Sequence, residues 1–292
     1  MFTEVGDSRN KLKSHRILLT TSSDLHDGNI LFHLPNSIDR LTTDQLYEKY
    51  REPYVEKVER FDDLPLDPWV PTHGVVAIWL GDDSNKISLA ESHIFLNDFS
   101  ESYQPAVDPQ TSSHTPLVLR SPELFMEPEA PVSFPAEIWS LACVIFGIMG
   151  YQTLFDTWFP SKDKVLALHV QALGRLPDKW WASWTNRHES FDDEARRIDG
   201  GPRQSLEHRF EYAIQKARRD SKMAEMDDEE KQAFLELMRS MLKFQPEDRV
   251  SAQQVLESRW MQNWAKPAFE SMEDMAKTPE SLSPDNTPSR LP

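Results

Sequence analysis

The chain has 292 residues, of which 39% are hydrophobic and 27% are charged, and its formal net charge is −16. These fractions are typical of a globular protein that buries a sizeable core. The negative charge argues against nucleic acid or an anionic membrane surface as the main partner, because phosphate groups are bound by Lys and Arg.

Short elements are predicted in the first third of the chain. Apolar runs predict three short strands, at residues 30–34, 75–80 and 94–96. The first of these strands is expected to be buried. Thr42 with Gln45 forms a capping box, which predicts a short helix as far as Tyr50. Proline, charge and hydroxyl content predict two long loops, at residues 51–74 and 100–135.

The rest of the chain predicts helices, at residues 137–149, 163–173, 205–219, 228–243 and 251–264. The first of them is apolar on nearly all faces, which predicts a helix buried at the centre of a domain. Ser251 with Gln254 forms a second capping box, at the start of the last helix. We expect three tryptophans to cover a helix-packing surface and not a ligand: Trp180, Trp181 and Trp184.

Cysteine count and hydropathy bear on the compartment. Cys143 is the only cysteine, so the chain can form no intramolecular disulfide, which fits a reducing intracellular compartment such as the cytoplasm or nucleus. No secretory signal is visible at the N-terminus. The longest apolar stretch, residues 141–149, is much shorter than the roughly 20 residues that span a bilayer. We therefore expect no membrane partner.

Two motifs carry groups suited to chemistry. Residues 24–29 spell D-L-H-D-G-N, in which Asp24 can reach a substrate hydroxyl while Asn29 reaches a metal ion. Asp98 ends an apolar strand and is followed by Phe and Ser, which resembles the D-F-G metal site with Ser100 in place of Gly. Taken alone, each motif is more typical of a turn than of a catalytic site, because Asp and Asn favour turns.

Three further segments follow in order. The first is R-S-P-E, which ends at Glu123, and the second is E-I-W-S-L-A, which begins at Glu137. The third is P-E-D-R-V-S-A, which contains Arg249. With the two motifs above, these segments resemble the C-terminal lobe of eukaryotic protein kinases over residues 24–265.

Within that superfamily the chain most resembles fungal serine/threonine kinases similar to SR-protein kinases. The shared stretches are SFPAEIWSLACVIFGIMG, LFDTWFPSKDKV, QALGRLPDKWW and PEDRVSAQQVLESRWM. The resemblance implies an α+β fold, a mainly helical kinase C-lobe with a few short strands. It leaves residues 1–23 outside the family, makes about 35–90 an insertion, and leaves 266–292 as a tail that its Ser, Pro and Asp content predicts to be disordered.

The resemblance implies transfer of the ATP γ-phosphate to a protein Ser or Thr hydroxyl. Asp24 would orient and deprotonate that hydroxyl, while Asn29 and Asp98 would hold Mg²⁺ and, through it, ATP. His26 stands where the family has a Lys that stabilises the transferring phosphate, and a neutral His offers less charge. If the subgroup is right, the substrates are basic proteins rich in Arg and Ser, which would suit the acidic chain. The acidity would equally serve solubility alone.

The resemblance also implies structural roles. In the family, the Arg at the position of Arg249 forms a buried ion pair with the Glu at the position of Glu123, and a buried charge needs such a partner. The carboxylate at the position of Glu137 steadies the backbone of the catalytic loop. We therefore expect Arg249 to pair with Glu123.

The chain departs from the family in its first residues. Nothing before Asp24 resembles the N-terminal lobe, which supplies a Gly-rich loop and a Lys for the phosphates. Ser22 and Ser23 also stand where the family has His and Arg. We therefore expect an absent or vestigial N-lobe, and a truncated product or an incomplete gene model.

Two other function classes stay open. A catalytically inactive kinase-like module could bind proteins through the helical surface without turning over ATP. A small-molecule phosphotransferase of the aminoglycoside or choline kinase type is suggested by the D-L-H-D-G-N spelling at residues 24–29. Affinity for Mg-ATP and the choice between a peptide and a small alcohol as acceptor would separate the three.

Overall fold

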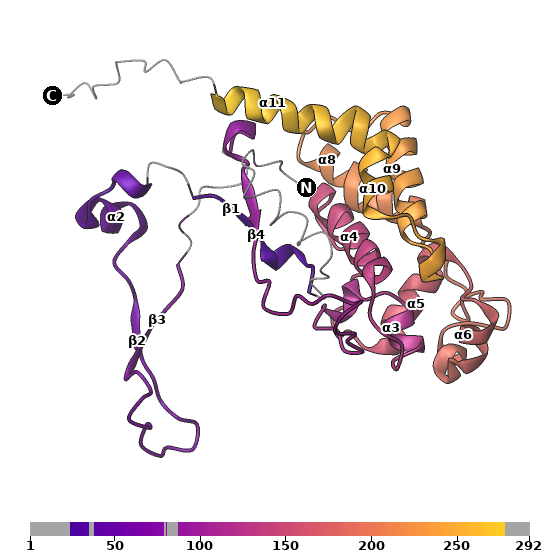
Figure 1. Ribbon diagram of the computed structural model, residues 1–292, viewed down its shortest axis with the longest axis horizontal. Helices are drawn as coiled ribbons and strands as arrows, with labels where there is room; N and C mark the ends of the chain where they lie inside the picture. Colours follow the sequence, from indigo (N-terminus) through magenta and orange to yellow (C-terminus); the bar gives the residue numbers. More distant parts are fainter. Residues whose placement is uncertain (1–23, 35–37, 79, 81–86, 278–292) are drawn as a thin grey trace. The chain divides into compact units, whose positions relative to one another are not determined.

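The computed structural model describes residues 24–34, 38–78, 80 and 87–277 (Figure 1). The chain divides into two compact units. We call the first the helical unit; its described residues are 24–30 and 96–269. The second, the insert unit, comprises the described residues within 31–95 together with 270–277, and it contains the predicted insertion of about 35–90. None of the described helices is long and apolar enough to cross a membrane.

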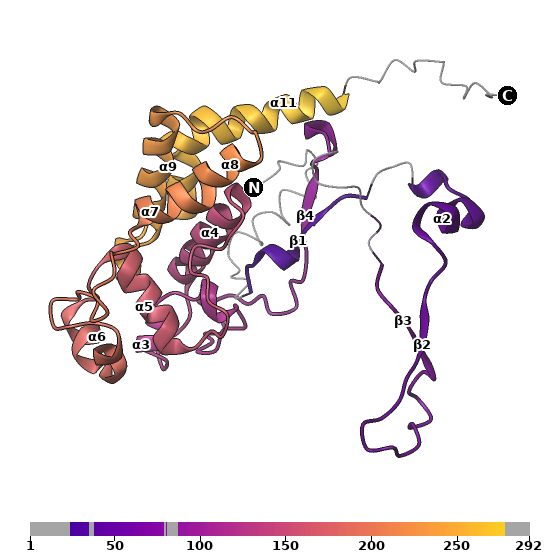
Figure 2. The ribbon, with the colours of Figure 1, turned by 180° about the vertical axis from the view of Figure 1, so that it is seen from behind.

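The helical unit is built around α4 (Phe134–Met149), as its apolar sequence predicts. Ser133 is the N-cap and Pro135 lies in the first turn, where its missing N–H leaves no hydrogen bond unmade. α9 (Asp228–Met241) packs against α4, and in both views of the ribbon the two helices lie in the same bundle (Figures 1 and 2). Trp139 and Phe146 on this helix are fully buried in the main core.

The helices predicted at 163–173, 205–219 and 228–243 are present, whereas two short helices, α3 and α6, were not predicted. The bounds of these helices and of α10 are α3 Glu123–Met126, α5 Lys162–Leu173, α6 Asp178–Ser183, α7 Leu206–Phe210, α8 Lys216–Asp220, α9 Asp228–Met241 and α10 Ala252–Glu257. A π-helical turn over Glu211–Gln215 joins α7 to α8, so the predicted helix of 205–219 is continuous. The loop predicted for 100–135 also contains α3 and a 3₁₀ turn at Leu117–Leu119, which sequence pattern did not indicate.

The three tryptophans form a second core, as predicted. Trp180, Trp181 and Trp184 are buried against α5 and Phe191. Because a buried indole N–H needs an acceptor, two of them find carboxylates: Trp180 Nε1 donates to Glu127 Oε1 at 3.0 Å, and Trp184 Nε1 donates to Asp163 Oδ1 at 2.6 Å. These side chains therefore pack helices together.

The C-terminal part differs from prediction. The capping box of Ser251 and Gln254 is present, but α10 ends at Glu257, and the chain continues through a π-helical turn (Met261–Ala265) into α11 (Lys266–Lys277). The disorder predicted from residue 266 is therefore wrong as far as 277. Residues 266–277 are rich in helix formers such as Ala, Glu, Met and Lys, and the Ser- and Pro-rich part, residues 278–292, lies outside the described residues.

The insert unit has little regular structure. The capping box predicted for Thr42 and Gln45 is present and opens α2 (Thr43–Tyr50). Two strands form an antiparallel hairpin, β2 (Val55–Lys57) and β3 (His73–Val75), with Val55 opposite Val75. The strand predicted at 75–80 thus ends where it was expected to begin, and Val76 to Ile78 carry no strand. Two-stranded ribbons provide no second layer, which explains why both valines stay exposed.

A second small sheet pairs β1 (Ile30–Phe32) with β4 (Ile94–Leu96), at two of the predicted strand positions. The expectation that the first strand is buried is wrong, because Phe32 is 55% exposed and Leu31 is also exposed. An apolar run of three to five residues cannot distinguish a buried strand from an exposed one by periodicity. The importance of this sheet lies in the two loops that it joins.

Candidate active site

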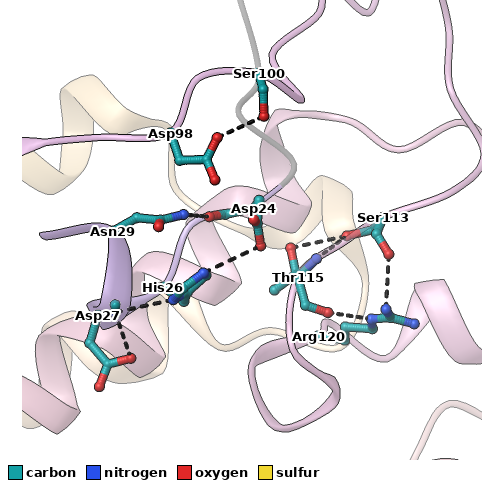
Figure 3. A network of polar contacts seen from close by, with 10 residues as sticks. Asp24, His26, Asp27, Asn29, Asp98, Ser100, Ser113, Thr115 and Arg120 are labelled. Atoms are coloured by element: carbon teal, nitrogen blue, oxygen red, sulfur yellow. Dashed lines mark hydrogen bonds and ion pairs between the residues drawn. The ribbon is translucent and has the colours of Figure 1, made fainter. Parts of the chain in front are cut away.

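The β1–β4 pair brings the two sequence motifs together. Asn29 immediately precedes β1 and Asp98 follows β4, and the Asn97 N–H donates to the Asn29 carbonyl oxygen at 2.8 Å. Two segments far apart in the chain are therefore hydrogen-bonded neighbours at this point. Figure 3 shows the Asp98 carboxylate next to Asn29 and Asp24.

The D-L-H-D-G-N segment folds back on itself. Asn29 Nδ2 donates to the backbone oxygen of Asp24 at 3.2 Å, and His26 caps a 3₁₀ turn over Asp27–Asn29 (Figure 3). His26 Nδ1 accepts from the Gly28 N–H at 3.1 Å, and its Nε2 lies 3.7 Å from Asp24 Oδ1. The turn thereby holds a carboxylate, an imidazole and an amide on one short loop.

Asp98 has an unusual backbone. Its φ of 56° is left-handed, a conformation that disfavours most side chains and is better tolerated by Asp and Asn. Ser100 Oγ donates to Asp98 Oδ1 at 2.7 Å, and the side chain and backbone of Ser100 together lower the pKa of Asp98, with a smaller contribution from His26. The residue that replaces the usual glycine thus acts as a donor that favours the ionised carboxylate. The sequence alone indicated only that Ser100 stands in place of the usual glycine.

These groups fit a magnesium ion. Asn29 uses its Nδ2 on Asp24, which leaves the amide oxygen as a ligand, and Asp98 is held ionised with more lone pairs than Ser100 occupies. Mg²⁺ typically takes one or two protein oxygens and completes its shell with phosphate and water. Among the described residues there is no group of three or more His, Cys, Asp and Glu side chains that would make a denser metal site.

A third segment lies beside this loop, and sequence reasoning did not single it out. Arg120 Nε donates to the backbone oxygen of Thr115 at 2.6 Å, and Arg120 Nη2 donates to the backbone oxygen of Ser113 at 2.9 Å (Figure 3). Ser113 Oγ also donates to Thr115 Oγ1 at 3.0 Å. Arg120 therefore fixes the shape of residues 113–115. In the sequence, this role could have been suspected only from Arg120, a charged residue directly before the S-P-E segment.

The predicted ion pair is present and buried. Arg249 Nη1 and Nη2 lie 2.7 and 2.6 Å from the two carboxylate oxygens of Glu123, a bidentate arrangement. The same guanidinium donates to the backbone oxygens of Pro135, Lys243 and Phe244. Every N–H donor of the fully buried Arg249 guanidinium thus has an acceptor. The pair joins the start of α3, the start of α4 and the turn before α10.

Glu137 lies in the first turn of α4, facing the same loops. It lines a small cavity together with Leu25 and Thr115, one residue from each of the two loops described above. Burial and then the charge of Glu137 raise the pKa of Tyr103 to about 12. The central helix therefore presents its carboxylate where the two loops meet.

A polar pocket of about 240 Å³ opens beside Ser100. It is lined by Ser100, Glu101, Ser102, Tyr103, Gln110, Ser112 and His114. His114 Nε2 lies 3.3 Å from Glu101 Oε2 at its wall. Because Ser100 is hydrogen-bonded to Asp98, a group bound in this pocket would lie next to Asp98, the candidate metal ligand.

Known proteins give a distant match. No family model matches the chain. Two serine/threonine protein kinases, from two strains of Aspergillus fumigatus, are each 26% identical to it over 172 residues. The match covers 57% of this chain and 39% of each kinase, so the chain aligns with well under half of the curated relatives' length. The chain is thus kinase-like, a distant relative of fungal serine/threonine protein kinases.

Proposed function

We propose that the helical unit is the C-lobe of a serine/threonine protein kinase, and that it contributes to transfer of the ATP γ-phosphate to protein Ser and Thr hydroxyls. The observation that carries the proposal is the meeting of Asp24, Asn29 and Asp98 at the ends of β1 and β4. The buried pair of Glu123 and Arg249 supports it, because it ties the segments around the site to the central helix.

In this proposal each side chain has one task. The Asp24 carboxylate accepts a hydrogen bond from the substrate hydroxyl and takes its proton. The Asn29 amide oxygen and the Asp98 carboxylate hold Mg²⁺, which when bound neutralises charge between the ATP phosphates. His26 presents a ring N–H near Asp24 in place of the cation that kinases use there. Arg120 keeps residues 113–115 in one conformation beside the site, where a substrate would lie.

The substrates in this proposal are basic proteins rich in Arg and Ser, as in SR-protein kinases. The net charge of −16 supports electrostatic attraction of such chains. Glu101 adds a carboxylate in the pocket beside Ser100, where a guanidinium of the substrate would find an acceptor. The match covers only 39% of each relative, so this specificity is proposed for the helical unit alone.

The test is phosphate transfer from Mg-ATP to an Arg/Ser-rich peptide by the full chain. Asp24→Asn removes the proton acceptor and Asp98→Asn removes a metal ligand, so each should abolish measurable transfer. Asp156→Asn, at an exposed carboxylate distant in sequence from both loops, is the matched control and should keep wild-type transfer. Transfer that survives in Asp24→Asn and Asp98→Asn would contradict the proposal. Transfer to a small alcohol but not to the peptide would favour the small-molecule phosphotransferase.

A second candidate function is a protein-binding module without turnover. Trp158 and Phe159 favour it, because their side chains are 95% and 77% exposed between α4 and α5. Exposed aromatic side chains of this size are unusual on a surface that binds nothing. Calorimetric titration with Mg-ATP separates the two: tight nucleotide binding supports the kinase, and its absence together with capture of a basic protein supports the module.

A further inference from the structure

At Gly28 there is no room for a side chain beside the His26 ring. Its backbone is not among the left-handed positions of the described chain, so φ does not require a glycine there. A Cβ added at Gly28 would lie 2.8 Å from His26 Cε1 and 2.9 Å from His26 Nδ1, closer than real Cβ contacts. A side chain at this position would therefore displace the imidazole. Because a ring can rotate away more easily than a backbone can, the fold would survive such a change.

The Gly28 amide also selects the tautomer of His26. A backbone N–H can only donate, so His26 Nδ1, 3.1 Å from it, must accept and carries no proton. Asp27 Oδ1, also 3.1 Å from this amide nitrogen, shares the same N–H. In the neutral imidazole the proton is then on Nε2. The opposite tautomer would place two donors against each other at Gly28.

The selected tautomer points a donor into the site. Nε2 faces Asp24 Oδ1 at 3.7 Å, too long for a hydrogen bond and short enough for attraction. A lone pair on Nε2 would instead repel the Asp24 carboxylate. The N–H therefore projects toward Asp24, the carboxylate that the proposed function assigns to the substrate hydroxyl.

We propose that Gly28 is a positioning residue, which by its amide N–H and its missing side chain holds His26 in the Nε2-protonated tautomer and aims that N–H at the transfer site. The kinetic part of this inference rests on the proposed kinase function. The tautomer part does not, because it concerns the free chain.

The first experiment measures the tautomer directly. The chain is labelled with ¹⁵N-histidine and studied without nucleotide, above the ordinary imidazole pKa of about 6.5, with His26→Asn identifying the resonances. We expect His26 to show an unprotonated Nδ1 and a protonated Nε2, and Gly28→Ala to convert this signal to a mixture of tautomers. Gly147→Ala is the matched control, because a Cβ there meets nothing within 4 Å, and it should leave the signal unchanged. A protonated Nδ1, or a His26 signal indifferent to Gly28→Ala, would overturn the proposal.

The second experiment is a double-mutant cycle on phosphate transfer. Gly28→Ala should lower kcat about tenfold with little change in KM for ATP, since it misaligns a donor made for the transition state. His26→Lys supplies a cation that needs no help from the Gly28 amide, so adding Gly28→Ala to it should have little further effect. Equal losses in both backgrounds would mean that Gly28→Ala damages the loop generally, and would overturn the positioning role. A chain with the expected tautomer but no transfer in any variant would sink the proposed function and leave the tautomer assignment standing.

Discussion

The helical unit and the insert unit differ in how they use apolar residues. Among the described residues, every buried hydrophobic side chain except Met272 belongs to the helical unit. In the insert unit, large apolar side chains such as Phe61 and Trp69 are exposed. Helices with apolar faces can enclose one another, whereas isolated helices and two-stranded ribbons have no second layer to cover them. The difference predicts that stability resides in the helical unit, and that the insert unit tolerates change.

The largest effect should follow loss of the buried ion pair. Arg249→Ala leaves the Glu123 carboxylate buried without its partner and frees three backbone oxygens, so we expect about 3–5 kcal/mol less stability in urea unfolding. Arg259→Ala is the matched control, because its pair with Glu229 is at the surface and is worth about 0–1 kcal/mol. Comparable losses from the two substitutions would show that the pair does not tie the helical unit together.

A slightly smaller loss of stability should be seen when a phenylalanine is replaced by alanine in the helical unit, and almost none when the same replacement is made in the insert unit. Phe146→Ala opens a cavity in the main core and should destabilise the chain by about 3–4 kcal/mol. Phe61→Ala, at a fully exposed ring of the insert unit, should change stability by no more than about 0.5 kcal/mol. Urea midpoints for both variants test the contrast. A large loss from Phe61→Ala would mean that the insert unit has a partner for its apolar surface.

A buried histidine should make the helical unit sensitive to acid. His169 is fully buried between Trp139 and Phe155, and neither ring nitrogen has a hydrogen-bond partner among the described residues. Burial, then the charges of Arg249 and Arg209, hold its pKa well below 6.5. As the pH falls below about 6.5, the pKa of a histidine in the unfolded chain, His169 binds a proton in the unfolded state but stays neutral in the folded state. Stability is complete above that pH and declines below it by about 1.4 kcal/mol per pH unit for this group.

The measurement is urea unfolding at several pH values between neutral and mildly acid. His169→Phe should flatten the dependence that belongs to this group, because phenylalanine takes up no proton. Phe155→Leu, which alters packing on the same ring, should lower stability at every pH and keep the wild-type slope. An unchanged slope in His169→Phe would mean that other groups cause the acid sensitivity.

The sequence predicted what depends on local pattern. Apolar periodicity located α4, α5 and α9, and hydroxyl-to-Gln spacing located both capping boxes. The resemblance to protein kinases also implied the pairing of Glu123 with Arg249, which the structure contains. These features follow from spacing along the chain or from charges that cannot be buried alone.

Features that depend on tertiary geometry were missed. The exposure of Phe32 is decided by whether another layer covers β1, and no window of sequence contains that information. Side-chain direction decides three further contacts, which no sequence pattern indicates. They are the hydrogen bond from Ser100 to Asp98, the hydrogen bonds from Arg120 to residues 113–115 and the close approach of Gly28 to His26. In the candidate site the sequence thus named the titratable groups, and the structure supplied the residues that orient them.

The smallest predicted effect compares one motif in the two units. Ser251 and Thr42 each cap a helix in a complete capping box, so either Ala substitution removes a hydrogen bond to an N-terminal amide, worth about 1 kcal/mol. α10 contributes the buried Val255 to the main core, whereas α2 has no buried residue. Ser251→Ala should therefore lower the free energy of global unfolding by about 1 kcal/mol. Thr42→Ala should leave global unfolding unchanged and only speed amide hydrogen exchange within α2, because local opening of the insert unit need not unfold the core. Equal global losses would show that the two units unfold as one cooperative body.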